Sequence, residues 1–138
     1  MQLLFLILSF LFSCQEVPKD IPIEKYRRQF IEGVVDIDKG LKDKLPKDKK
    51  FLILSVRSPE DPMPIAVLRK ENPDFPYRFK ITGKDKLSHE KVMEGRVTLT
   101  ARISTSGIAQ TQKGDLIGSL QTSVGTKENK VIINAEVR

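Results

Sequence analysis

The sequence has 138 residues, of which 39% are hydrophobic and 30% are charged, and its formal net charge is +6. This length predicts one domain with short appendages, since a domain typically has about 100–200 residues. A single cysteine excludes an intrachain disulfide and a cysteine-rich metal site. The positive charge allows attraction to anionic lipid or to an acidic partner. Lysines are interspersed with acidic residues and the few aromatic residues form no stacking pattern, so nucleic-acid binding is not predicted.

Residues 1–13 are almost entirely apolar and predict the hydrophobic region of a signal peptide. The run is shorter than the ~20 residues that a membrane-spanning helix needs. The adjoining Leu11-Phe12-Ser13-Cys14 resembles the lipobox of bacterial lipoproteins, although Phe12 is bulky and no Lys or Arg precedes the run. This resemblance implies cleavage after residue 13 and a lipid on Cys14. The alternatives are an ordinary N-terminal strand, or a cleaved signal peptide followed by a cysteine that has no role.

Residues 14–28 are polar and predict a tether, because Pro18 and Pro22 restrict helix formation. A single acyl chain anchors a protein only marginally, whereas two or more anchor it stably. Mature bacterial lipoproteins resemble the proteins that are anchored by two or more chains. We therefore expect a lipid-anchored protein of the bacterial cell envelope that faces the periplasm, with residues 29–138 as its folded domain.

From residue 29 onward, short segments alternate apolar with polar residues, as strands do. We expect strands at 31–37, 51–56, 65–68, 77–81, 97–103, 116–124 and 131–137. The continuous apolar run at 51–56 predicts a strand that is covered on both faces. Turn clusters rich in Pro, Gly and Asn separate these segments. Seven or eight short strands of this kind predict an all-β sandwich or barrel.

The stretch 101–118 joins two of these strands through two turn signals. Residues 104–107 offer hydroxyl groups and a glycine that can adopt positive φ, and Gly114 begins the second turn. Gly118 interrupts an apolar segment, which predicts a bulge or the close approach of another backbone. Nothing in this stretch predicts a catalytic site.

Ala-Arg-Ile-Ser-Thr-Ser-Gly-Ile-Ala at 101–109, followed by Gly-Asp-Leu-Ile-Gly at 114–118, resembles the periplasmic C-terminal domain of CycH-type cytochrome c biogenesis proteins. Segments 33–41 and 63–69 fit the same pattern in the same order, so the resemblance covers roughly residue 29 to the C-terminus. It implies an immunoglobulin-like antiparallel β-sandwich.

The resemblance further implies a chaperone or scaffold role without catalysis or a cofactor, with apocytochrome c or the haem-assembly complex as partner. In that family, tetratricopeptide repeats are the better candidates for grasping the client, and these 138 residues contain none. An accessory that docks onto another envelope complex is therefore an alternative.

Two of the predicted strands carry cations at alternate positions. Arg96 and Arg102 lie on one, and Arg78 and Lys80 on the other. If these strands are neighbours, the four residues form one basic face that could bind a protein partner. The exposed edge of a sandwich can also accept an extended peptide as an added strand.

His89 is the single histidine, and a Ser-His-Asp triad would require it. It lies in a polar segment without a nucleophile-elbow pattern, so we interpret it as an exposed loop residue and predict no enzyme. The rival function is a periplasmic copper-binding or redox-accessory protein. His89 and Met93 have helical i, i+4 spacing, Met63 could join them, and one imidazole with thioethers would suit Cu(I). The competing interpretation makes both methionines core or loop filler.

Overall fold

A computed structural model describes residues 27–88 and 92–138 of the chain. The predicted leader, Cys14, nearly all of the tether, and His89 lie outside the described residues. The described chain forms eight strands and two short 3₁₀ helices: β1 (Phe30–Ile37), η1 (Lys39–Lys44), β2 (Phe51–Arg57), β3 (Pro64–Glu71), β4 (Tyr77–Thr82), η2 (Gly83–Asp85), β5 (Arg96–Ser104), β6 (Leu116–Ser123), β7 (Thr126–Ile133) and β8 (Ala135–Glu136). None of its helices has the length and apolar character needed to cross a membrane.

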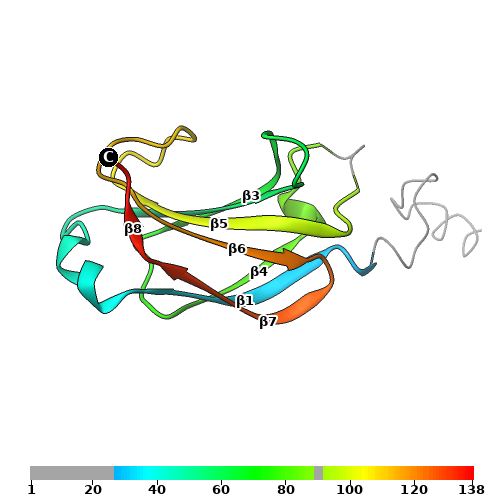
Figure 1. The fold of residues 1–138 in the computed structure, drawn as a ribbon, viewed down its shortest axis with the longest axis horizontal. Coiled ribbons are helices and arrows are strands. Elements are labelled where there is room, and N and C mark those ends of the chain that lie inside the picture. The colour runs from blue at the N-terminus through cyan, green and yellow to red at the C-terminus, as the bar shows by residue number, and fades with distance from the viewer. Residues whose placement is uncertain (1–26, 89–91) are drawn as a thin grey trace, which may run out of the picture.

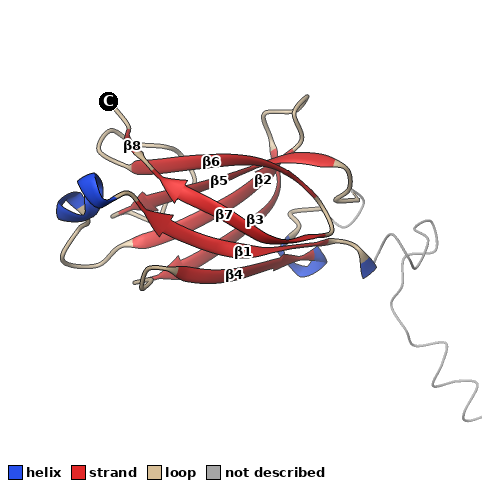
Figure 2. Cartoon of the chain, turned by 60° about the horizontal axis from the view of Figure 1, so that its bottom comes forward, coloured by secondary structure: helices blue, strands red, loops and turns tan. Residues whose placement is uncertain are grey.

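The strands form a sandwich of two sheets (Figure 1). The smaller sheet has the order β4-β1-β7 and the larger has the order β3-β2-β5-β6-β8. The two sheets lie face to face, as Figure 2 shows from a second direction. The predicted all-β, immunoglobulin-like sandwich is confirmed. Neighbouring strands are antiparallel except β1 and β7, which run parallel, a detail that alternation along single strands does not reveal.

The core lies between the sheets and follows the predicted period of two. Its fully buried large side chains are Ile31, Val35, Leu52, Leu54, Val56, Ile81, Met93, Val97, Leu99, Ile103, Leu116 and Ile133. Strand β2 is covered on both faces, as predicted, since Leu52 and Leu54 enter the core while Phe51 and Ile53 are also buried. The guanidinium of Arg69 stacks on the Phe51 ring, 4.4 Å from its centroid. This stacking covers the outer side of β2.

The predicted final strand at 131–137 has the wrong bounds. Strand β7 begins at Thr126, and the chain then crosses to the other sheet as β8. At the crossing, the Asn134 N–H donates to the carbonyl oxygen of Ile117, 3.1 Å away. The first half of β7 was missed because its inward position is a polar residue, Asn129, which interrupts the apolar alternation.

Gly118 lies where the two sheets approach each other, which confirms the predicted close backbone contact. A Cβ atom at this position would collide with the carbonyl oxygen of Ile132 on β7. Gly33 on β1 admits the carbonyl oxygen of Asn129 in a similar way, but β1 and β7 are neighbours within the smaller sheet. Glycine therefore permits one close backbone contact between the sheets, at Gly118, and one within the smaller sheet, at Gly33.

Strand directions assign the loops to two ends of the sandwich. Phe30 faces Thr82, Arg57 faces Thr98 and Arg96 faces Ser123, so the described chain begins at the same end as the loops after β2, β4 and β6. We call this the entry end. Helix η1, loop 105–115 and the C-terminus lie at the opposite end (Figure 1). We call that the far end.

Candidate protein-binding surface

The outer face of the smaller sheet carries an exposed row of charged side chains. Along β1, Ile31 and Val35 enter the core, so Glu32, Val34 and Asp36 face outward. On β4 the same alternation turns Arg78 and Lys80 outward.

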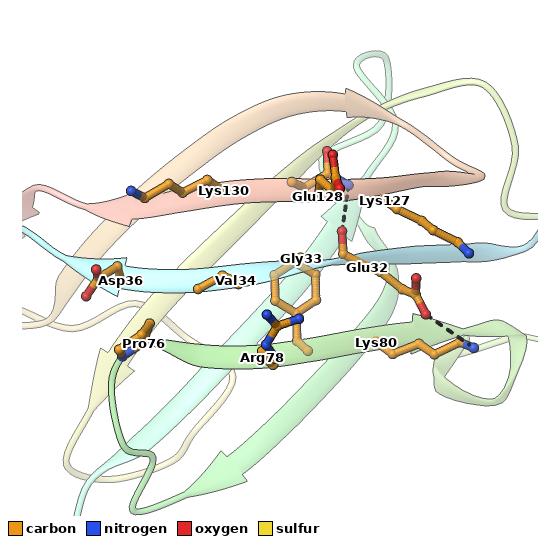
Figure 3. Close-up of a pocket in the computed structure, with 12 residues that line it drawn as sticks. Glu32, Gly33, Val34, Asp36, Pro76, Arg78, Lys80, Lys127, Glu128 and Lys130 are labelled. Carbon is orange, nitrogen blue, oxygen red and sulfur yellow. Dashed lines mark hydrogen bonds and ion pairs between the residues drawn. The ribbon is translucent and has the colours of Figure 1, made fainter.

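Register then decides which of these outward residues meet. Val34 lies opposite Arg78, and Glu32 lies opposite Lys80. The Lys80 ammonium pairs with the Glu32 carboxylate at 3.4 Å, so the row is partly neutralised at one end (Figure 3).

A β-bulge in β7 supplies the other border of this face. Between the pairs Ile31–Thr126 and Gly33–Asn129, two residues of β7 oppose a single residue of β1. The first bulge residue is Lys127 and the second is Glu128, whose φ is 62°. A bulge of this kind bends its strand and redirects side chains. Here it brings the Lys127 and Glu128 side chains to the border of the outer face (Figure 3).

The buried Asn129 side chain fixes the bulge. Its amide nitrogen donates to the carbonyl oxygen of Glu32 at 2.9 Å and lies 3.0 Å from the hydroxyl of Thr126. Its amide oxygen accepts a 2.6 Å hydrogen bond from the hydroxyl of Thr122. These bonds tie β6, β7 and β1 together at the bulge.

An open groove of about 800 Å³ runs along β1 between these borders. We call it the β1 groove. Its cations are Arg78, Lys80, Lys127 and Lys130, its carboxylates are Glu32, Asp36 and Glu128, and Val34 and Pro76 add apolar surface. Within the described chain, neither Arg78 nor Lys130 forms an ion pair. The groove therefore offers free cations beside acceptors and a small apolar patch, which suits a polar polypeptide segment better than a small apolar ligand.

The four predicted partner-binding cations do not form one basic face. Arg78 and Lys80 lie on β4 in the smaller sheet, whereas Arg96 and Arg102 lie on β5 in the larger sheet. Strands β4 and β5 are therefore not neighbours, and their outer sides face away from each other. Arg96 is exposed at the entry end.

Arg102 corrects the sequence analysis most clearly, since it is only 5% exposed. One guanidinium nitrogen donates to the Asp115 carboxylate at 2.8 Å. The other donates to the carbonyl oxygens of Ile108 and Ala109, at 2.7 Å and 3.0 Å. The side chain does point away from the core, but loop 105–115 folds over it. Arg102 thus holds this loop in place and is not available to a partner.

The methionines of the copper hypothesis have different surroundings. Met93 is buried in the core, and Met63, in the loop before β3, is 63% exposed, so one methionine has a core position and the other a loop position. His89 lies outside the described residues. In the described ranges, no three His, Cys, Asp or Glu side chains come together as a group that could hold a metal ion. No observation therefore favours a site shared by the three residues.

Comparison with known proteins agrees with the architecture. An uncharacterized protein of Aquifex aeolicus (strain VF5) is 46% identical over 142 residues, covering 97% of this chain and 95% of that protein. The structure of an alternative pilotin from the type II secretion system of Vibrio cholerae is similar, with a TM-score of 0.53, and covers 80% of this chain and 97% of the pilotin. At 16% identity this likeness shows the fold alone.

Residues 31–134 match the family model described as the cytochrome c-type biogenesis protein H Ig-like domain. The match spans most of the chain, including all of the core strands and the Arg102–Asp115 pair. The chain therefore belongs to the family of cytochrome c-type biogenesis protein H Ig-like domains.

Proposed function

We propose that this chain is a non-catalytic interaction module of the bacterial cell envelope that assists cytochrome c maturation as a chaperone or scaffold. Membership of the cytochrome c-type biogenesis family supports the process and the location. The observation that carries the binding role is the β1 groove, an open charged surface beside strand β4, whose outer edge is unpaired in the described part of the chain.

Strand β4, which borders the groove, offers a second place for an extended segment at its outer edge. Within residues 27–88 and 92–138, it pairs with β1 on one side and ends its sheet on the other. An edge strand presents unpaired N–H and C=O groups to which a further strand can bind. Arg78 and Lys80 would then attract carboxylates of the added segment.

The composition of the groove supports binding over catalysis. Among the residues that the structure describes, its lining contains Lys, Arg, Asp, Glu and Asn but no Ser, Cys or His. The groove therefore lacks, among these residues, the common catalytic arrangement of a hydroxyl or thiol nucleophile next to a base. An apocytochrome segment or a component of the haem-assembly complex is the partner that the family favours.

Charge reversal tests this proposal on the full-length protein. Arg78→Glu with Lys80→Glu is compared with Lys42→Glu with Lys113→Glu, two exposed lysines outside the groove. We expect affinity purification from membranes to recover apocytochrome c or haem-assembly proteins with wild type and control, and several-fold less with the groove variant. Equal recovery by the groove variant would show that the β1 groove does not bind these proteins. If only components of another envelope assembly are recovered, the proposed role in cytochrome c maturation is wrong.

We further propose that Cys14 carries the lipid anchor. The thiol lies thirteen residues before Arg27, so an extended tether spans at most about 45 Å at about 3.5 Å per residue. Such a tether would keep the domain close to the membrane. Cys14→Ser should move the protein from the membrane to the periplasmic fraction, as followed by immunoblotting. An unchanged distribution would show that the protein is held in another way.

A further inference from the structure

Two of the most exposed large hydrophobic side chains share one corner of the sandwich. In the described part of the chain, three such side chains are exposed: Met63 by 63%, Leu87 by 61% and Ile108 by 43%. The Leu87 N–H donates to the carbonyl oxygen of Ile65, 2.9 Å away, and Ile65 is two residues from Met63. Single exposed hydrophobics need no explanation, but a pair at one corner of a charged surface is a candidate contact.

This corner lies at the entry end, where the described chain begins (Figure 1). The Gly125 N–H donates to the carbonyl oxygen of Phe30, which fixes the first strand beside the β6–β7 turn. The proposed lipid on Cys14 lies thirteen residues before Arg27. The proposed lipid would therefore bring a bilayer to the end of the sandwich that carries Met63 and Leu87.

The charge of the entry end also suits an anionic bilayer. Among the described residues, its loops and strand ends outside the β1 groove carry six cations against four carboxylates. The cations are Arg27, Arg28, Arg57, Lys84, Lys86 and Arg96, and the carboxylates are Glu60, Asp61, Asp85 and Glu94. Basic side chains near a surface of anionic lipid are attracted to it.

We propose that Met63 and Leu87 form a membrane-docking corner that rests in the interface of an anionic bilayer when Cys14 is lipidated. This inference rests on the proposed lipid anchor. Two aliphatic side chains would bind a bilayer weakly from free solution. A tether of this length gives them a high effective concentration at the surface, so weak contacts suffice.

Docking at this corner would orient the domain. Loop 105–115 and helix η1 lie at the far end and would point away from the membrane. The β1 groove lies on the outer face of the smaller sheet and would stay open toward a partner. Anchor, corner and groove would then have separate roles.

The absence of tryptophan from the sequence permits a direct test. Full-length lipidated Leu87→Trp is reconstituted into vesicles of phosphatidylglycerol and brominated phosphatidylcholine. The matched control is Ile108→Trp, which replaces the exposed aliphatic residue of far-end loop 105–115. We expect bromine to quench Leu87→Trp at least three-fold more than Ile108→Trp. Adding Met63→Asp to Leu87→Trp should reduce that quenching.

Flotation of the vesicles measures attachment by the lipid anchor separately from docking of the corner. Equal quenching of the two variants on protein that floats would overturn the docking corner and leave the lipid anchor intact. Failure of the wild-type protein to float would overturn both the anchor and the docking that rests on it. A circular-dichroism melting curve for each variant verifies that the fold is kept.

Discussion

The outer faces of the two sheets differ in the surroundings of their arginine side chains, one of which is buried and the other exposed. Arg102 on β5 and Arg78 on β4 both occupy outward positions of amphipathic strands. Loop 105–115 closes over Arg102 and satisfies it with one carboxylate and two carbonyl oxygens. No described carboxylate pairs with Arg78, which stays exposed along the β1 groove. Arg102 therefore stabilises the fold, whereas the Arg78 side chain remains accessible to a partner.

The largest expected effect comes from breaking the closed face. Arg102→Met leaves the buried Asp115 carboxylate without its cation, and loss of one member of a buried pair costs about 3–5 kcal/mol. We expect the free energy of unfolding, measured with guanidinium chloride, to fall by that amount. The double variant Arg102→Met with Asp115→Leu should recover part of the loss, because no unpaired charge remains. A loss below about 0.5 kcal/mol, as at ordinary surface sites, would mean that Arg102 does not hold the loop.

A second prediction concerns the contact that joins the two sheets. Gly118→Ala places a methyl group against the Ile132 carbonyl, so we expect a loss of about 1–3 kcal/mol in the free energy of unfolding. Gly40→Ala is the matched control, because its added methyl group meets no atom within 4 Å. If both variants unfold at the same denaturant concentration, the sheets are not in backbone contact at this point.

The sequence was sufficient to predict the fold. It was not sufficient to predict which charged side chains are exposed to a partner. Alternation and two continuous apolar runs located most of the strands, and the Ser104–Gly107 and Gly114–Asp115 turns located the loop between β5 and β6. Arg102 is buried because that loop folds back over the sheet and its carbonyl oxygens accept from the guanidinium. No residue pattern within β5 predicts this burial.

Strand pairing was equally hidden from a single sequence. Whether β4 lies beside β5 or beside β1 depends on contacts between distant segments. The bulge in β7 was missed because the buried Asn129 interrupts the apolar period. Lys127 and Lys130 consequently entered the candidate site only through the structure.

The smallest stability effect is expected on the open face. Arg78→Glu with Lys80→Glu removes the Lys80–Glu32 ion pair on the surface and places like charges opposite each other, and each of these effects is about 0–1 kcal/mol. We expect this variant to unfold within about 1 kcal/mol of wild type in the same denaturant titration. A loss as large as that of Arg102→Met would mean that the two faces have the same structural role.

The most direct test of the account follows holocytochrome c in cells. The chromosomal copy is replaced by Arg78→Glu with Lys80→Glu, or by the control Lys42→Glu with Lys113→Glu, and c-type cytochromes are measured by haem staining at equal levels of this protein. We predict a several-fold loss of haem-stained cytochrome c with the groove variant and none with the control. Wild-type amounts of holocytochrome c with the groove variant would contradict the claim that this face serves cytochrome c maturation.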